Sequence, residues 1–426
     1  MSDRFEQELV DLSKSNVAPQ QPQLVSSPLL AAVCAAGTKH IYADSADGKE
    51  IGALVAAGDG RIYREIDGST ANQPLIRKVF DRYLSELDIK EWSARLRAAD
   101  PSLSPQLLTA TVYAAICGRA GNDVVHSFAA GRDWGVSLQL HMDLAGDAAA
   151  AKRIGRALRQ MVPSGVVKVP FSPHHPECFL VARDLEREGI PINFTSTFSA
   201  RQTVAAALLA DVTLTNIFMG RINQGLDATM LGEHVDLCAQ RELRRLRQEQ
   251  GVKTLLIVAS VREWQTFAHV AGCDVFTSPV SAIKDFMTQT EIPVGEIRSQ
   301  LETSYKDQMA IGAKALDTLG VEGIARLYEV EPEFVRFLVE TRQRSEYAQL
   351  QDGEPLVRWF EQAGFGDFFY APSDSEWQEL SKNKLPQLDS THAQQLELDT
   401  LYTLLADADF IKYQAEMDQL LQPHLG

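Results

Sequence analysis

The chain alternates short apolar or β-branched runs with longer stretches that carry apolar residues at three- and four-residue spacing. The first pattern is typical of strands and the second of helices. Eight strands are predicted in this way, at residues 40–46, 62–70, 135–142, 166–170, 191–196, 211–218, 254–260 and 274–279. The interval from 70 to 135 is longer than the others and holds several helical patterns, which indicates an insertion or an elaborated unit.

Alternating strands and helices over residues 40–300 favour an α/β fold, a (β/α)8 TIM barrel, whose usual length is ~250 residues. An open, doubly wound sheet is the alternative, but no glycine-rich phosphate-binding fingerprint follows any predicted strand. Residues 1–39 predict an N-terminal helical extension, and residues 301–426 carry helical spacing throughout. We therefore expect a catalytic barrel domain at 40–300 between an N-terminal helical extension and a helical C-terminal extension.

Composition limits the partners of this protein. The 426 residues carry a formal net charge of −16, which disfavours nucleic acid and anionic membranes as partners. A small phosphorylated ligand stays compatible, because it needs only two or three local cations. The N-terminus resembles no signal peptide and no apolar run approaches ~18 residues, so we expect a cytoplasmic protein. Five cysteines lie far apart without metal-ligand spacing, which predicts reduced thiols and no metal site.

One lysine stands inside a predicted buried strand. Residues 164–170 read SGVVKVP, and Lys168 lies in the middle of the apolar run. An edge-strand lysine whose ammonium reaches water is the ordinary explanation of such a pattern. The alternative is a desolvated amine whose pKa is lowered, by apolar neighbours and by nearby arginines, so that it can attack a carbonyl.

Polar residues recur near the ends of the predicted strands, where TIM-barrel enzymes place their chemistry. They are Asp44, Thr70, Asn72, Gln139, Lys168, Asn193, Thr195, Asn216, Arg221, Ser260 and Arg262. Taken singly, a helix cap would account for Asp44 and a turn for Asn72. A hydrogen-bonded pair at a strand end would account for Asn193 and Thr195, and a surface ion pair for Arg221. The recurrence of polar residues at corresponding strand ends around the barrel instead favours a single polar pocket.

That pocket would contain one amine, one carboxylate, several amide or hydroxyl groups and two guanidiniums. Such a set suits imine chemistry on a phosphorylated sugar. The amine condenses with a ketone, and the protonated imine accepts electrons as the adjacent C–C bond breaks. The carboxylate moves protons, the amides hold hydroxyls, and the arginines bind the phosphate.

Several segments together resemble the transaldolase family. YADSADGKEI is similar to the family's opening strand, and DGSTANQPLI to its Gly-x-Thr-Thr-Asn-Pro-Ser-Leu signature. VVKVP resembles the segment around the family's Schiff-base lysine. EGIPINFTSTFSARQTVAAALLADVTLTNIFMGRI and VASVREWQTFAHVAGCDVFTSP are similar to the segments that follow. The combination is specific, although each piece alone is weak.

The resemblance implies roles for individual residues. Lys168 would form the imine, and Asp44 would move the proton of the substrate hydroxyl. Thr195 would help to hold a catalytic water. Gln139 belongs with these catalytic positions. The substrate-binding positions are Asn72, Asn193, Asn216, Phe218, Arg221, Ser260 and Arg262. The dihydroxyacetone moiety would contact Asn72 and Asn193, and the phosphate would contact Arg221 and Arg262, with Ser260 nearby.

The implied reaction moves a dihydroxyacetone unit from sedoheptulose 7-phosphate or fructose 6-phosphate to an aldose phosphate, as in the pentose phosphate pathway. No metal or organic cofactor is implied. The expected partners are small phosphorylated sugars, and a homodimer is considered as the assembly.

Two departures from the family pattern keep alternatives open. Gln139 stands where transaldolases carry a glutamate that acts with water, and the fructose 6-phosphate aldolase branch carries a glutamine there. That branch pairs its glutamine with a tyrosine, whereas this chain has the transaldolase-like Phe218. Asn216 stands where a serine is usual and would reshape the substrate pocket. An aldolase-like or specialised sugar-phosphate transaldolase is therefore the first alternative. A sugar-phosphate-binding protein without turnover is the alternative from another class, although a pure binder has no need of a buried amine.

Overall fold

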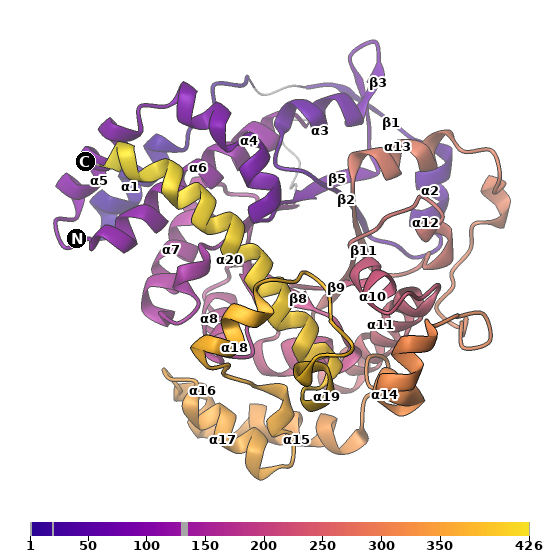
Figure 1. Ribbon diagram of the computed structural model, residues 1–426. Coiled ribbons are helices and arrows are strands. Elements are labelled where there is room, and N and C mark those ends of the chain that lie inside the picture. Colours follow the sequence, from indigo (N-terminus) through magenta and orange to yellow (C-terminus); the bar gives the residue numbers. More distant parts are fainter. Residues whose placement is uncertain (1, 19–20, 129–134, 426) are drawn as a thin grey trace. The chain divides into compact units, whose positions relative to one another are not determined.

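The computed structural model describes residues 2–18, 21–128 and 135–425 (Figure 1). The chain divides into two compact units. The first comprises Met1–Ser27, Tyr42–Lys168 and Phe410–Gly426, and the second comprises Pro28–Ile41 and Val169–Asp409. Each unit therefore combines segments that are far apart in the sequence.

Eight strands form a closed barrel in the order β10-β11-β2-β5-β6-β7-β8-β9. Their bounds are β2 His40–Asp44, β5 Ile66–Thr70, β6 Gly135–Gln139, β7 Gly165–Pro170, β8 Ile192–Thr197, β9 Leu214–Phe218, β10 Leu255–Ala259 and β11 Val275–Ser278. Helices follow the strands along the chain, and the strand pairs β5–β6, β6–β7, β8–β9, β9–β10 and β10–β11 are parallel. The predicted (β/α)8 TIM barrel is confirmed, and all eight predicted barrel strands are present.

One predicted strand is divided in the structure. The run at 62–70 becomes β4 Arg61–Tyr63 and β5, and only β5 belongs to the barrel. β4 instead pairs with β1 Gln23–Val25 and β3 Ala56–Gly58 in a small three-stranded sheet. The prediction of one continuous strand was wrong here because both segments are β-prone and only their tertiary partners separate them.

In the first unit, long helices cover the barrel strands. The sequence predicts several helices between residues 70 and 135, and the described part of that interval contains α4 Gln73–Glu86, α5 Ile89–Ala99 and α6 Pro105–His126. α6 packs against β6, α3 Gly48–Val55 and α7 Ala148–Met161, and most of its residues are buried. The unit also contains α1 Ser2–Leu12 and the short helix η1 Met142–Leu144.

In the second unit, the helices between the strands come first along the chain. They are α2 Pro28–Ala35, which precedes β2, and then α8 Glu177–Arg187, α9 Ala200–Ala205, the π-helix η2 Ala206–Ala210, α10 Met219–Gly225, α11 Leu231–Gln250, α12 Thr266–His269 and α13 Val280–Thr288. Many of their apolar residues are fully buried, as the three- and four-residue spacing predicts.

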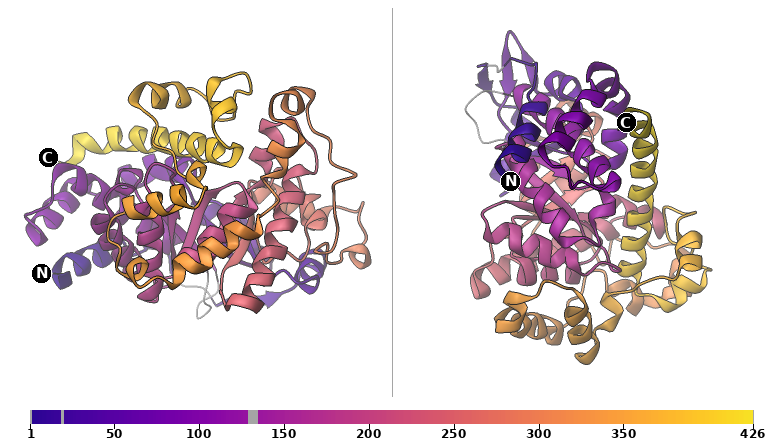
Figure 2. Two further views of the ribbon diagram at one scale, coloured as in Figure 1. Left: turned by 90° about the horizontal axis from the view of Figure 1, so that it is seen from below. Right: turned by 90° about the vertical axis from the view of Figure 1, so that its left-hand side faces the viewer.

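The chain beyond residue 300 is helical, as predicted. Its elements are α14 Ala313–Ala325, α15 Pro332–Gln343, α16 Ser345–Gln349, α17 Glu354–Gln362, η4 Gly366–Phe368, α18 Asp374–Leu380, α19 Thr391–Gln395 and α20 Leu398–Leu425, with η3 Val294–Glu296 before them. Figure 2 shows α20 as one continuous helix, drawn in yellow. Within the part of the chain that the structure describes, no helix is both long enough and apolar enough to cross a membrane.

Candidate active site

Lys168 lies on β7, a strand whose residues are all buried. Its side chain is 3% exposed, and its Nζ donates a hydrogen bond to the Ala71 carbonyl oxygen at 3.1 Å. β7 is a central strand of the closed barrel and not an edge strand. The ordinary explanation of an edge-strand lysine whose ammonium reaches water is therefore wrong for Lys168.

Burial lowers the pKa of Lys168 to about 8, and the Asp44 carboxylate opposes this shift. At pH 7 roughly one amine in ten is then neutral, against about one in a few thousand for a lysine in water. Nearby arginines were expected from the sequence to contribute part of this lowering. Burial accounts for it without them, and the charged group that affects the Lys168 pKa is Asp44.

The segment that follows β5 connects Asp44 with Lys168. Asp44 ends β2 and is half-buried, and its Oδ1 accepts a hydrogen bond from Thr70 Oγ1 at 2.8 Å. The next residue, Ala71, supplies the carbonyl that Lys168 contacts. Asn72 then caps α4, because its Oδ1 accepts from the Leu75 amide at 3.1 Å. The cap therefore uses the side-chain oxygen of Asn72. The two N–H donors of the same side-chain amide are not part of the cap.

Gln139 is the register partner of Lys168 on the neighbouring strand β6. Partners in a parallel pair direct their side chains to the same face of the sheet. The Gln139 side chain is 1% exposed, and its Nε2 lies 3.8 Å from Met142 Sδ. Within the described residues, its Oε1 is buried and has no hydrogen-bond donor. The structure therefore places the amide that departs from the family pattern beside the lysine.

In the second unit, three buried polar side chains form one hydrogen-bonded chain. Asn216 Nδ2 donates to Asn193 Oδ1 at 3.1 Å, and Thr195 Oγ1 donates to Asn216 Oδ1 at 3.3 Å. The register of β8 against β9 shifts between Phe194 and Thr197, where Ser196 has a φ of +65°. Such irregularities are common beside active sites, because they redirect side chains. Asn193 and Thr195 are thus joined through Asn216 and not as a simple strand-end pair.

Arg221 lies on α10, just after β9, with its guanidinium 5.7 Å from the centre of the Phe218 ring. Its Nη2 lies 2.9 Å from Asp409 Oδ2 on α20. A surface ion pair was the ordinary alternative for Arg221 at the level of sequence. Arg221 does form an ion pair, but its partner Asp409 is buried, with 3% of the side chain exposed.

The turns after β9 and β10 approach each other closely. A Cβ at Gly220 would overlap the Ser260 carbonyl oxygen and would press against Arg262 Cγ, so only glycine fits there. Ser260 itself has a φ of +61°, an uncommon conformation for a residue with a side chain. This approach places Arg262 near the start of the helix that carries Arg221. Arg262 is exposed and lines a cavity of about 800 Å³ with Gly220 and residues of α10 and α11.

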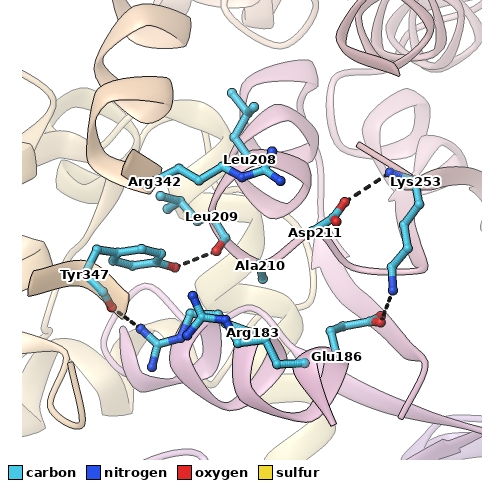
Figure 3. A pocket seen from close by; sticks show the side chains of 10 residues that line it. Arg183, Glu186, Leu208, Leu209, Ala210, Asp211, Lys253, Arg342 and Tyr347 are labelled. Carbon is cyan, nitrogen blue, oxygen red and sulfur yellow. Dashed lines mark hydrogen bonds and ion pairs between the residues drawn. The ribbon is translucent and has the colours of Figure 1, made fainter. Parts of the chain in front are cut away.

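A second cavity, of about 300 Å³, contains none of the predicted site residues (Figure 3). Arg183 donates to the Leu350 carbonyl oxygen at 2.8 Å and to that of Tyr347. On the other side of the cavity, Lys253 Nζ lies 2.6 Å from Glu186 Oε2. Both cations are thus bound to protein oxygens: Arg183 joins α8 to α16, and Lys253 joins the start of β10 to α8. These contacts explain the cavity as a place where elements are held together.

Three potential metal ligands come together in the first unit: His141, Asp143 and Asp418. Both ring nitrogens of His141 already have protein partners. Nε2 lies 3.0 Å from Asp418 Oδ1, and Nδ1 accepts from the Asp143 amide at 3.2 Å. The cluster is therefore explained as a link between α20 and the turn after β6.

The family model described as transaldolase/fructose-6-phosphate aldolase matches residues 41–329. This match covers more than half of the chain, and the protein belongs to that family. A protein of Thermus thermophilus named "Probable transaldolase" is 27% identical over 258 residues, which are 60% of this chain and 94% of that protein. A "Probable transaldolase" of a Hydrogenobaculum species is 30% identical over 190 residues, 44% of this chain and 81% of that protein.

Sequence reasoning missed the residues that hold the predicted ones in place. Thr70 was recognised only as a polar residue at a strand end, and it orients Asp44. Asp409 and Lys384 were not recognised at all, because their part of the chain lies outside the barrel. The segment LLADADFI offered a signal, since two carboxylates interrupt an otherwise apolar helical run and buried carboxylates require partners.

Proposed function

We propose that this protein transfers a dihydroxyacetone unit from a ketose phosphate to an aldose phosphate through an imine on Lys168. The observation that supports it most directly is a buried lysine whose pKa burial lowers to about 8, while the charge of the Asp44 carboxylate acts on the same amine. A neutral amine is the nucleophile that imine formation requires. Family membership and the names of the relatives support the same reaction class.

The proposed sequence of steps balances without a cofactor. The neutral Lys168 amine adds to the C2 carbonyl of the ketose. The resulting hydroxyl takes up a proton from solvent and leaves as water, which gives a protonated imine, and the proton is returned to solvent when the imine is hydrolysed. Asp44 accepts the proton of the C4 hydroxyl as the C3–C4 bond breaks, and the bonding electrons move into the imine to give an enamine. The aldose phosphate leaves. The enamine then attacks the aldehyde carbon of the acceptor, Asp44 returns the proton, and hydrolysis frees the lysine.

The other predicted residues would bind the substrate. In the first unit Asn72 has amide N–H groups to donate, while its oxygen is used in the α4 cap. In the second unit Asn193, Thr195 and Asn216 are linked by hydrogen bonds, and such a chain is suited to hold sugar hydroxyls or a water. Arg221 and Arg262, with Ser260, would bind the phosphate.

Gln139 favours a second candidate, an aldolase of the same imine chemistry. The Gln139 amide lies beside Lys168 in the register of β6 and β7, where typical transaldolases carry a carboxylate. An amide can hold a water molecule but cannot accept its proton. Cleavage without transfer to an acceptor is the behaviour that this alternative predicts.

Reductive trapping tests the proposal. The protein is incubated with fructose 6-phosphate, reduced with cyanoborohydride and mapped by peptide mass spectrometry, with and without erythrose 4-phosphate as acceptor. We expect an adduct on Lys168 that disappears when the acceptor is present. Lys168→Ala should abolish the adduct and the turnover, whereas Lys78→Ala, an exposed lysine on α4 of the same unit, should change neither.

The outcomes separate the candidates. An adduct on Lys168 that the acceptor does not remove would support the aldolase. Near-normal turnover in folded Lys168→Ala would refute the imine mechanism. Absence of any adduct with any ketose phosphate would favour a sugar-phosphate-binding protein.

A further inference from the structure

A carboxylate from the helical C-terminal extension, that of Asp409, forms an ion pair with Arg221. Arg221 is one of the two arginines that the proposed function assigns to the substrate phosphate. Asp409 Oδ2 lies 2.9 Å from Arg221 Nη2, and Asp409 Oδ1 lies 2.8 Å from Lys384 Nζ. The Asp409 side chain is 3% exposed. A buried carboxylate therefore bridges two cations, and a phosphate monoester would use the same kind of donors.

The helix that carries Asp409 is fixed against the same elements. Tyr402 OH donates to the Ile222 carbonyl oxygen at 3.2 Å, next in sequence to Arg221. Thr403 Oγ1 donates to the Ser196 carbonyl oxygen at 3.0 Å, at the irregular end of β8. Gly225 on α10 has no room for a side chain, because a Cβ there would overlap Tyr402. Asp409 is thus held at Arg221 by the packing of α20 and not by a chance side-chain rotamer.

We propose that Asp409 is a specificity-determining residue that competes with the substrate phosphate for Arg221. This inference rests on the proposed function. Because Asp409 neutralises part of the charge of Arg221, the site binds phosphorylated ketoses more weakly than an unshared arginine would. Lys384 draws the carboxylate toward itself and supplies a second cation for the phosphate. The protein therefore discriminates only modestly between phosphorylated ketoses and ketoses that lack a phosphate.

The test compares two donors, fructose 6-phosphate and fructose, by the rate and half-saturation of adduct formation on Lys168. In Asp409→Asn we expect the preference for fructose 6-phosphate to increase about tenfold, since a hydrogen bond to a charged group of this kind is worth roughly a factor of ten or more. The gain should appear as a lower half-saturation concentration for fructose 6-phosphate, with fructose unaffected.

Two further variants make the comparison specific. Glu397→Gln removes the same charge from an ion pair with Arg326, outside the predicted site, and should leave the preference unchanged. Lys384→Met removes a cation whose side chain is 55% exposed and leaves Asp409 on Arg221. It should lower the preference for fructose 6-phosphate several-fold, and it provides the test if Asp409→Asn does not fold.

A purely structural role for Asp409 would lower the reactivity of both donors together. An unchanged ratio in both Asp409→Asn and Lys384→Met would overturn the inference while leaving the imine mechanism intact. Absence of a Lys168 adduct from either donor in the unmodified protein would count against the proposed function instead. Calorimetric binding of fructose 6-phosphate to the unmodified and Asp409→Asn proteins gives the same comparison without turnover, and equal affinities would overturn the inference.

Discussion

At neutral pH, the rate at which a lysine attacks a carbonyl is limited by the fraction of the amine that carries no proton. For Lys168 this fraction is set by two opposing effects. Burial lowers its pKa, and the negative charge of Asp44 raises it again, which leaves a pKa of about 8. The carboxylate that moves protons in the proposed reaction therefore also limits how much of the lysine is neutral.

This balance predicts the pH dependence of adduct formation. Below pH 8 the rate of cyanoborohydride trapping on Lys168 should rise about tenfold per pH unit, because the neutral fraction rises by that factor, and it should level off above the Lys168 pKa of about 8. Asp44→Asn should move the inflection to lower pH, whatever its effect on the maximal rate. An inflection near that of a lysine in water would contradict the burial argument.

A second prediction concerns Gln139, which lies beside Lys168 in the strand register. Gln139→Glu should increase the rate of transfer to an acceptor by at least about tenfold, because a general base is commonly worth ~10²–10⁴-fold. Steady-state assays with erythrose 4-phosphate measure this rate. The new negative charge should also raise the Lys168 inflection. Gln139→Met, which is similar in size but uncharged, is the control, and equal rates in the two variants would count against a role for this position.

The individual site residues differ in how far the sequence could predict them. Lys168 and Gln139 could be placed because a charged or polar residue inside an apolar strand pattern is itself a signal. The helix cap made by Asn72 could not be told from a binding role, since both use the same amide. The contact between Arg221 and Asp409 spans 188 residues, and no local pattern in the sequence specifies a partner at that separation.

At the scale of elements, a buried ion pair within the second unit fastens the start of α20 to α9. Asp399 Oδ1 lies 2.7 Å from Arg201 Nη2, while its Oδ2 accepts from Arg201 Nε at 2.7 Å and from Ser199 Oγ at 2.6 Å. Burial alone would raise the pKa of Asp399, but Arg201 and Ser199 reverse this effect, so the pKa is lowered overall. The carboxylate is thus stabilised in its charged form.

Asp399→Ala should lower the free energy of unfolding by about 3–5 kcal/mol, because it leaves Arg201 buried without its main partner. Urea unfolding followed by circular dichroism measures the change. Glu333→Ala, in an exposed pair with Arg336 whose side chains are both 64% exposed, should change it by less than ~1 kcal/mol. Similar losses in the two variants would show that the Asp399 pair does not anchor α20.

The lowered pKa of Asp399 also gives a pH dependence of stability with a definite sign. A carboxyl group whose pKa is lower in the folded state stabilises the protein above its unfolded pKa of about 3.9. That contribution is lost as the pH falls through the folded value. The difference in unfolding free energy between the unmodified protein and Asp399→Asn should therefore shrink on acidification below about pH 4. A constant difference over that range would contradict the assignment.

Elements with a strong period could be predicted from the sequence, whereas their assignment to sheets could not. The apolar spacing of α6 and the β-branched run of β10 identify a helix and a strand without reference to the rest of the chain. The segment at 61–70 has the same local preferences in β4 and β5, and only their different neighbours place them in different sheets. The contacts of the C-terminal helices with the barrel elements were equally out of reach, because those partners are distant in sequence.

At the scale of the whole molecule, the two compact units do not coincide with continuous stretches of sequence. The second unit combines strands β8 to β11 with residues 301–409, and the family match ends at residue 329. Phe171 on the turn after β7 and Phe179 on α8 are fully buried and lie 5.2 and 6.2 Å from the ring of Phe368. The domain boundary at residue 300 remains a prediction. The contacts of Phe368 join residues on the two sides of that boundary.

A chain that ends at residue 300 tests whether the helical C-terminal extension is separable. Such a chain would expose Phe171 and Phe179 and would lose the Asp399 partner of Arg201. Each buried phenylalanine contributes about 1.5–3 kcal/mol relative to exposure, and natural domains have only about 5–15 kcal/mol to lose. We therefore expect a poorly soluble chain that binds a hydrophobic dye, lacks cooperative unfolding and forms no Lys168 adduct.

Point variants of the full-length chain separate loss of packing from loss of the extension as a whole. Phe368→Ala should lower the unfolding free energy by about 3–5 kcal/mol, as for other buried phenylalanines, because its ring packs against Phe171 and Phe179. Val321→Ala, at a position that is 69% exposed, should be neutral within ~0.5 kcal/mol. If the chain ending at 300 unfolds cooperatively and still traps fructose 6-phosphate on Lys168, the extension is a separate domain. In that case neither Asp399 nor Asp409 is needed for the imine chemistry.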